Sequence, residues 1–237
     1  MFYRRFFHRT PPGACRGKVA HGSPVFGRLR SKAPSRNPVK PSEANLSENS
    51  PSETKSEIVS SEQEALILVD AADNVVGHLD KSACHDGEGI LHRAFSVFIF
   101  NSAGQLLLQQ RASNKRLWPD YWSNSCCSHP RQGEVMDVAV GRRVGQELGI
   151  NCDLTFTYKF EYSASFESTG TEHELCWVYI GQTTHEPVIN TTEIRDWRWM
   201  DTAELTAALS ARADTFTPWL ALEWQRLSED FTALLPG

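Results

Sequence analysis

Two short, well separated segments constrain the fold of this chain more than any other feature. The first carries Cys127 and His129 two positions apart, and the second carries Glu172 and Glu174 two positions apart. Alternate side chains of an extended segment point to the same face, so each pair shares one side of a strand. Buried carboxylates are costly unless they meet water, a cation or a function. We therefore expect two strands to meet across a pocket whose thiol, imidazole and carboxylates can hold a divalent metal and move protons.

The chain divides into two parts of opposite charge. It has 237 residues and a formal net charge of −5, but residues 1–40 contain ten Arg or Lys and no Asp or Glu. The remaining residues therefore hold 14 basic residues (24 − 10) and 29 acidic ones, a net charge of −15. An acidic folded region argues against nucleic acid as a partner.

Residues 1–63 are predicted to be a disordered extension. They are rich in Pro, Ser, Arg and Glu and have few periodic apolar positions. Residues 1–40 resemble an organelle transit peptide, and a disordered tail without a targeting role is an equal alternative. Residues 64–237 are predicted to form the folded domain, so we expect deletion of residues 1–60 to be tolerated.

The cysteines and the hydropathy bear on location. None of the six cysteines has the spacing of a zinc ribbon, and in a chain of this length we expect them to be reduced. No apolar run reaches the length of a membrane span. These features predict a cytoplasmic protein, or an organellar one if the N-terminal segment is a transit peptide.

Apolar periodicity predicts mixed secondary structure. A turn is expected at Asp73-Asn74 and a hairpin turn at 101–104, Gly149 should end a helix, and Asp201 should cap a short one. The order of elements indicates an α/β (α+β) fold. The predicted strands are 66–69, 95–100, 106–111, 155–163, 173–181 and 196–200, and the longer predicted helices are 134–148 and 218–234.

Six motifs follow one another in the order found in one enzyme family. They occupy residues 91–96, 106–112, 118–124, 124–130, 142–149 and 172–174. Together these motifs closely resemble the type I isopentenyl-diphosphate isomerases, a branch of the Nudix fold, over roughly residues 64–232. The resemblance implies a Nudix-like α/β/α sandwich with a mixed sheet. It also implies the interconversion of isopentenyl and dimethylallyl diphosphate in isoprenoid biosynthesis.

The same resemblance assigns the catalytic groups. Cys127 and Glu174, the latter assisted by Tyr162, would add a proton to one carbon of the substrate and remove a proton from another. Cys126 should point away from Cys127 into packing, because adjacent residues of a strand face opposite sides. We expect a nearby cation to lower the pKa of the catalytic thiol.

Two metal ions are implied by the resemblance. Three imidazoles and two carboxylates suit a borderline divalent ion, and the resemblance assigns one ion (manganese, zinc or magnesium) to this set. A magnesium ion bound with the substrate diphosphate would contact Glu147, for which a plain helical pair with Arg143 is the alternative. The five predicted ligands of the first ion are His85, His92, His129, Glu172 and Glu174.

The substrate is expected to be a small isoprenoid diphosphate, and the protein a monomer or weak homodimer. The resemblance places Trp219 beside Tyr162 in the isoprenoid pocket, where an aromatic face can stabilise a carbocation. Other tryptophans, including Trp118, are assigned to the core. Four cations should bind the diphosphate, and arginine suits phosphate oxygens particularly well. They are Lys81, Arg111, Lys115 and Arg143.

A Nudix diphosphohydrolase is the alternative enzyme. Such hydrolases cluster carboxylates on one helix to hold the magnesium ions that activate water. Glu134 and Arg142 match that signature, but its glycine and two of its carboxylates are replaced by Ser128, Arg143 and Gln146. This loss argues against hydrolysis. A catalytically inactive metal-binding module is a third possibility, against which the intact Cys127 and Glu174 count.

Overall fold

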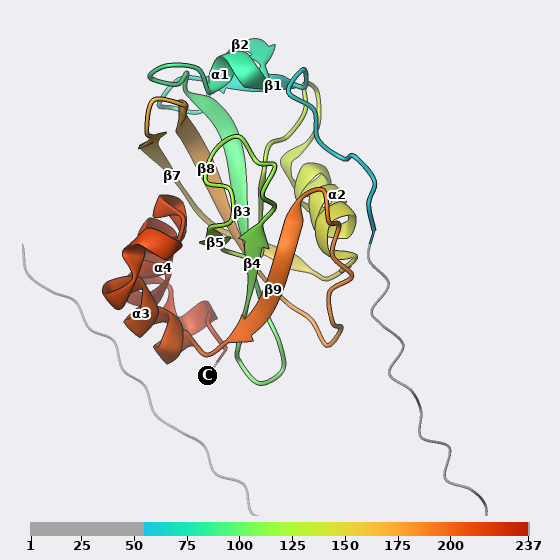
Figure 1. Cartoon of the computed structure of the whole chain (residues 1–237), viewed down its shortest axis with the longest axis vertical. Helices are drawn as coiled ribbons and strands as arrows, with labels where there is room; N and C mark the ends of the chain where they lie inside the picture. The colour runs from blue at the N-terminus through green and yellow to red at the C-terminus, as the bar shows by residue number, and fades with distance from the viewer. Residues whose placement is uncertain (1–54, 237) are drawn as a thin grey trace, which may run out of the picture. The chain divides into compact units, whose positions relative to one another are not determined.

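The computed structural model describes residues 55–236. A mixed β-sheet lies between helix α2 (Met136–Leu148) on one side and helices α3 (Thr202–Ala211) and α4 (Pro218–Asp230) on the other (Figure 1). The predicted Nudix-like α/β/α sandwich is therefore confirmed. Among residues 55–236, no helix combines the length and the apolar character needed to cross a membrane.

The strands agree with the sequence prediction wherever apolar periodicity was strong. Strands β2 and β5 and the short helix α1 were not predicted. Val75 and Val76 of β2 are 54% and 65% exposed and give no burial pattern. The strands are β1 (Ala65–Val69), β2 (Val75–Asp80), β3 (His92–Phe100), β4 (Leu106–Arg111), β5 (Trp122–Ser123), β6 (Cys126–Ser128), β7 (Leu154–Phe166), β8 (Gly170–Gln182) and β9 (Ile194–Met200). The short helices are α1 (Lys81–Cys84), η1 (Ala213–Thr215) and η2 (Thr232–Leu234).

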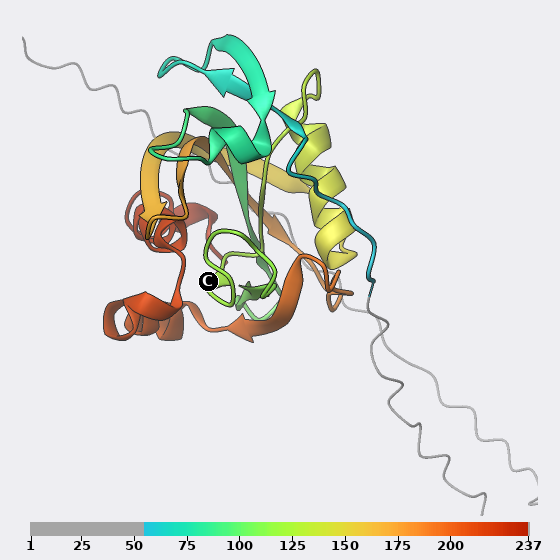
Figure 2. The same ribbon diagram turned by 45° about the horizontal axis from the view of Figure 1, so that its top comes forward.

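Strand β3 is the centre of the sheet. It pairs in parallel with β8 over its whole length and antiparallel with β1, β4 and β6. Strands β7 and β8 form a long antiparallel hairpin, and β4 also pairs with β5 and β9. The β1–β2 hairpin lies over one end of the sheet (Figure 2).

Alternate residues of β3 build the two cores. Phe98 and Phe100 pack with α3 and α4, whereas Phe95, Val97 and Ile99 pack with α2. All five side chains are at most 1% exposed. Because both faces are buried, a slip of one residue would exchange the two sets, so packing fixes the register of β3.

The predicted turns and the end of α2 agree in position with the structure, whereas α4 ends at Asp230, before the predicted residue 234. Asp73 has a positive φ of 67° in the β1–β2 turn, and Gly149 ends α2 with φ 66°. Helix α3 begins after Asp201, but the Asp201 side chain makes no capping hydrogen bond. Its Oδ1 instead accepts a hydrogen bond from Gln105 Nε2 at 3.1 Å. The prediction of a side-chain cap is therefore wrong.

Residues 55–63, predicted to belong to the disordered extension, pack on the domain. The amide of Lys55 donates to the carbonyl of Ile189 at 3.0 Å, and Val59 is 6% exposed. Ser60 Oγ donates to Glu193 Oε1 at 2.8 Å. The predicted boundary at residue 64 is therefore too late, because these contacts are mostly polar and leave no apolar pattern. Residues 1–54, including the transit-like segment, lie outside the described residues.

Two truncations test this boundary. Deletion of residues 1–54 should leave the free energy of unfolding nearly unchanged, because every contact described above is retained. Deletion of residues 1–63 should lower it by about 2–4 kcal/mol, through loss of Val59 burial and several hydrogen bonds. Urea unfolding of both variants measures the difference. Identical midpoints would show that the segment contributes nothing to the domain.

Helix α4 carries a carboxyl group on its buried face. Glu223 is 0% exposed, and its Oε1 accepts a weak hydrogen bond from Cys176 Sγ at 3.4 Å. Within the described residues, its Oε2 has no hydrogen-bond partner. Burial raises the pKa of Glu223 to about 8. The side chain is therefore mostly protonated at neutral pH.

This raised pKa predicts a particular dependence of stability on pH. The unfolded chain loses the Glu223 proton near pH 4.5, whereas the folded protein keeps it until about pH 8. The folded state binds more protons in that window, so stability decreases as the pH rises through it, by about 1.4 kcal/mol per unit of pH. Glu223→Gln should remove this decrease, whereas Glu229→Gln, at an exposed position of α4, should not. Urea unfolding at pH 5, 6.5 and 8 tests the prediction, and parallel profiles for wild type and Glu223→Gln would contradict it.

Candidate active site

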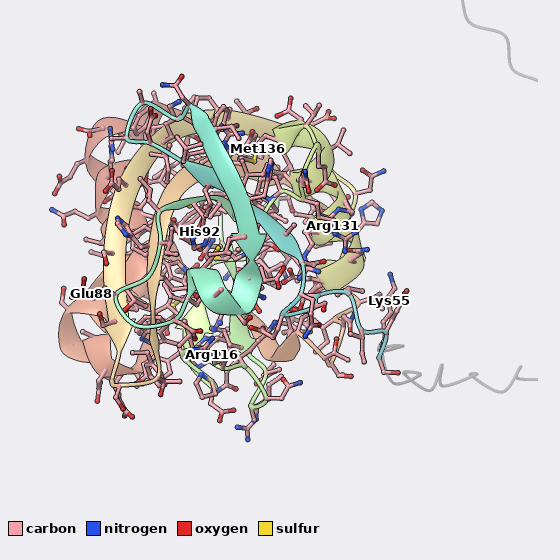
Figure 3. The ribbon with its side chains drawn as sticks, turned by 90° about the horizontal axis from the view of Figure 1, so that it is seen from above. Lys55, Glu88, His92, Arg116, Arg131 and Met136 are labelled. Atoms are coloured by element: carbon pink, nitrogen blue, oxygen red, sulfur yellow. The ribbon has the colours of Figure 1, made fainter. Side chains whose placement is uncertain are left out.

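Five side chains predicted as metal ligands gather at one end of the sheet. Their nearest ligand atoms all lie within 4.8 Å of one another. His92 lies near the centre of this end of the domain in Figure 3, beneath the β1–β2 hairpin. All but one of the five residues are buried, and His129 is half-buried. The set consists of His85, His92, His129, Glu172 and Glu174.

Strand pairing positions these ligands. His92, the first residue of β3, lies opposite Glu174 of β8, and Glu174 in turn lies opposite Tyr162 of β7. His129 directly follows β6, the antiparallel partner of β3. The His85 loop approaches β8 closely at Gly170, where a side chain would collide with the His85 carbonyl. The amide of the next residue, Thr171, donates to that carbonyl at 3.0 Å.

The hydrogen bonds of the imidazoles leave lone pairs pointing inward. Nδ1 of His85 donates to the Lys81 carbonyl, and Nδ1 of His92 donates to the Ile90 carbonyl, both at 2.7 Å. Such outer contacts fix the tautomer and leave Nε2 free to bind a metal. Nε2 of His92 lies 3.2 Å from Nε2 of His129. Burial lowers the pKa of His129 to about 4, so this imidazole is neutral at pH 7.

Two buried atoms of the cluster indicate a cation. His85 Nε2 and Glu172 Oε2 lie 2.6 Å apart. Yet within residues 55–236 neither atom has a hydrogen-bond partner. With the His85 proton on Nδ1, both atoms present lone pairs to each other, and a metal ion between the ligands would satisfy both. Mixed nitrogen and oxygen donors fit a divalent ion.

The predicted catalytic thiol lies in the same pocket as His129, as the strand alternation indicated. Cys127 Sγ donates to Asn124 Oδ1 at 2.8 Å and accepts from Trp219 Nε1 at 3.2 Å. Burial, with the nearby Glu223 as a second cause, raises the pKa of Cys127 to about 12. Arg111 does lower this pKa, as expected of a nearby cation, but burial and Glu223 outweigh it, so the net shift is upward.

Cys126 is 0% exposed and packs with residues of α2. The prediction that it points away from the pocket is confirmed.

Tyr162 and Trp219 line the pocket beside the cluster of three His and two Glu side chains. The phenol of Tyr162 donates to Glu174 Oε2 at 2.7 Å. Burial, and then the carboxylate of Glu174, raise the pKa of Tyr162 well above its usual value, so the phenol stays protonated. The two aromatic rings lie 6.3 Å apart, and Trp118 packs edge-on against Trp219. This part of the pocket is therefore aromatic and largely closed to solvent.

All four predicted diphosphate-binding cations line the same pocket. Arg111 donates to the carbonyls of Leu117 and Trp118, and its guanidinium lies 5.3 Å from the centre of the Trp219 ring. Arg116, which the sequence analysis did not assign, also lines the pocket. It donates to the carbonyl of Ser82 at 3.1 Å and ion-pairs with Asp86. The cationic end of the pocket contains Lys81, Arg111, Lys115, Arg116 and Arg143.

Glu147 does not join the His/Glu cluster. It is 2% exposed on α2, and its Oε1 accepts a hydrogen bond from Arg143 at 2.6 Å. The helical pair considered as an alternative is therefore present. Its assignment as a contact of a diphosphate-bound magnesium ion stays a prediction.

The sequence analysis missed several groups of the site. Asn124 lies within a motif and holds the Cys127 thiol, so its position beside the cysteines could have indicated a role. Glu193 and Glu223 approach the pocket from elements far away in the sequence, and neither has a neighbouring motif. Only the tertiary structure reveals them.

Comparisons with known proteins agree with this geometry. The sequence matches the NUDIX domain family over residues 90–220. Isopentenyl-diphosphate Delta-isomerase 2 of Photorhabdus laumondii is 40% identical over 175 residues, which cover 69% of this chain and 98% of that protein. Isopentenyl-diphosphate Delta-isomerase 2 of Aromatoleum aromaticum is 43% identical over 159 residues, which cover 67% and 84%.

Solved structures show the same fold. Protein DR0079 of Deinococcus radiodurans has a TM-score of 0.58 at 25% identity, covering 69% of this chain and 98% of that one. A MutT protein of Methanosarcina mazei has a TM-score of 0.50 at 16% identity, covering 60% and 95%, and shows the fold alone. The sandwich, the matched domain and the extensive identity to curated relatives lead to one conclusion. The chain belongs to the Nudix superfamily and, within it, to the isopentenyl-diphosphate Delta-isomerase family.

Proposed function

We propose that this protein interconverts isopentenyl diphosphate and dimethylallyl diphosphate in isoprenoid biosynthesis. One observation carries the proposal: Cys127, Glu174 and Tyr162 line a single pocket whose other end is cationic. Proton-transfer groups thus lie beside a site suited to a diphosphate. The family relatives, at about 40% identity, support the same reaction.

The reaction moves a double bond by adding one proton and removing another. One group protonates the terminal methylene carbon and gives a tertiary carbocation. The second group removes a proton from the carbon nearer the diphosphate, which restores a double bond with no net change in composition. Cys127 and Glu174 are the proposed pair, and the reverse direction exchanges their roles. Tyr162 holds Glu174 through the hydrogen bond from its phenol.

The pocket must also protect the carbocation. Trp219 is 3% exposed, and an aromatic face can stabilise a desolvated cation by ~2 kcal/mol or more. Exclusion of water prevents its capture as an alcohol. A divalent metal in the His/Glu cluster would polarise the Glu174 carboxyl group when bound.

The diphosphate is assigned to the cationic end of the pocket. Lys81, Arg111, Lys115 and Arg143 are proposed to bind its oxygens, and arginine can do so with two parallel hydrogen bonds. A magnesium ion would accompany the diphosphate and contact Glu147. The metal of the His/Glu cluster is proposed to be manganese, zinc or magnesium.

Hydrolysis is disfavoured because Arg143 and Gln146 replace two carboxylates of the hydrolase signature. Arg142 donates to both carboxylate oxygens of Glu134, at 2.6 and 2.7 Å. Arg143 occupies Glu147 in a similar way. The carboxylates that remain from the hydrolase signature are thus paired with arginine. Incubation with isopentenyl diphosphate separates the possibilities: dimethylallyl diphosphate indicates an isomerase, released phosphate a hydrolase, and no product an inactive module.

We also propose a cytoplasmic location and a monomer or weak homodimer. The five cysteines within the described residues are free, as expected in a reducing compartment. An organellar location is the alternative if residues 1–40 are a transit peptide.

Replacement of the proposed catalytic thiol should abolish isomerisation without unfolding the protein. Cys127→Ala removes a proton-transfer group, which should lower kcat by about 10²–10⁴-fold. Cys126→Ala is the matched control, because Cys126 packs on the opposite face, and it should keep most activity. Turnover of isopentenyl diphosphate and the melting temperature are measured for both. A loss of turnover in Cys126→Ala but not in Cys127→Ala would refute the assignment.

Two glutamates should differ in their effect on metal content. Glu174→Gln should lose both activity and the metal, because Glu174 belongs to the His/Glu cluster. Glu147→Gln should keep that metal and instead require more magnesium for substrate binding. Glu161→Gln, on the neighbouring strand and exposed, is the control. Elemental analysis of the purified proteins tests the prediction, and equal metal loss in Glu174→Gln and Glu147→Gln would contradict two separate sites.

A further inference from the structure

A buried carboxylate lies among the proposed diphosphate-binding cations. Glu193 directly precedes β9, is 4% exposed, and lines the same pocket as Lys115 and Arg143. No sequence motif marks it, and it lies outside the His/Glu cluster. A carboxylate at an anion site would normally repel the substrate, so its presence requires an explanation.

Glu193 holds two of the cations at once. Its Oε2 ion-pairs with Lys115 Nζ and lies 3.2 Å from an amino nitrogen of Arg143. Its Oε1 accepts the hydrogen bond from Ser60. Although burial opposes it, Lys115 and then Arg143 lower the pKa of Glu193 to about 2, so the group is ionised. One carboxylate therefore fixes the directions of two long, flexible side chains.

The main chain of Glu193 is itself fixed. Its amide donates to the Asn190 carbonyl and its carbonyl accepts from the Ala112 amide, each at 3.0 Å. The Asn190 side chain donates to the Glu57 carbonyl at 2.7 Å. The carboxylate is thus supported by the segment before β9, by the loop after β4 and by the N-terminal segment.

The hydrogen bonds of the Arg143 guanidinium show how tightly this side chain is held. One terminal nitrogen donates to the Val59 carbonyl at 2.7 Å, and the other contacts Glu147 and Glu193. In the part of the chain that the structure describes, Arg143 Nε is buried and has no hydrogen-bond partner. An unpaired buried N–H of a cation is costly, so the contacts of the two terminal nitrogens must hold this guanidinium in place.

We propose that Glu193, held by Ser60, is a positioning residue for the diphosphate. It orients Lys115 and Arg143 so that the ammonium and guanidinium groups can bind the phosphate oxygens. This inference rests on the proposed function of the pocket. Both Glu193 oxygens already have protein partners, which favours positioning over direct metal binding. Residues 59 and 60 thereby become part of the substrate site, although no proton transfer involves them.

Four variants test the role: Glu193→Gln, Glu193→Asp, Ser60→Ala and, as a control, Glu186→Gln. Loss of a charge-assisted contact should raise the KM of isopentenyl diphosphate about 10–100-fold in Glu193→Gln, with a much smaller change in kcat. Glu193→Asp should recover part of the affinity, and Ser60→Ala should show a weaker form of the same defect. Glu186 is exposed and near in sequence, so its replacement should change nothing.

Calorimetric binding of inorganic diphosphate separates this inference from the proposed reaction. A wild type that binds diphosphate without isomerising the substrate would refute the reaction but leave the positioning role testable by Glu193→Gln. Unchanged KM and diphosphate affinity in Glu193→Gln and Ser60→Ala would refute the positioning role. Recovery of the Glu193→Gln affinity by excess magnesium would also refute it, since Glu193 would then be a metal ligand. If Glu193→Gln fails to fold, Ser60→Ala and Glu193→Asp decide.

Discussion

The parallel pairing of β3 with β8 is the constraint on which the site depends. It places His92 opposite Glu174, and the antiparallel partner β7 adds Tyr162 on the far side. The imidazole of His92, the carboxylate of Glu174 and the phenol of Tyr162 thus form one row across three neighbouring strands. Phe98 and Phe100 lock β3 in this register by packing under α3 and α4. The packing of the hydrophobic core therefore sets the positions of these three side chains.

The pocket contains two kinds of buried charge. Three imidazoles and two carboxylates form the His/Glu cluster, and five arginine or lysine side chains also line the pocket. Burial of either set of charges alone would cost free energy, and each set is compensated in its own way. A cation between His85 and Glu172 would satisfy the unpaired atoms of the His/Glu cluster. Glu147 and Glu193 neutralise part of the positive charge of the arginine and lysine side chains. A bound metal would thus pair with the remaining carboxylates and imidazoles, and a bound diphosphate with the remaining cations.

Sequence patterns predicted the features that follow from a local periodicity of apolar residues or from the alternation of side chains along a strand. Apolar periodicity predicted the mixed α/β class and most strands, the family resemblance predicted the sandwich, and strand alternation distinguished Cys127 from Cys126. The structure also brings the five predicted metal ligands together. The missed features depend on contacts between distant segments. The exposed β2 and residues 55–63 lack apolar patterns, Glu193 has no motif, and the raised pKa of Cys127 follows from burial that no local sequence reveals.

The state of Cys127 bears on how a Nudix fold can serve isomerisation. As one of the two proposed proton-transfer groups, Cys127 must release a proton in one direction and take one up in the other. Burial keeps this thiol protonated at neutral pH, while Asn124 and Trp219 hold its sulfur by hydrogen bonds. Two arginines of α2 pair with Glu134, which precedes the helix, and with Glu147, which lies within it. In the proposed reaction the neutral thiol of Cys127 would donate its proton in one direction and recover it in the other.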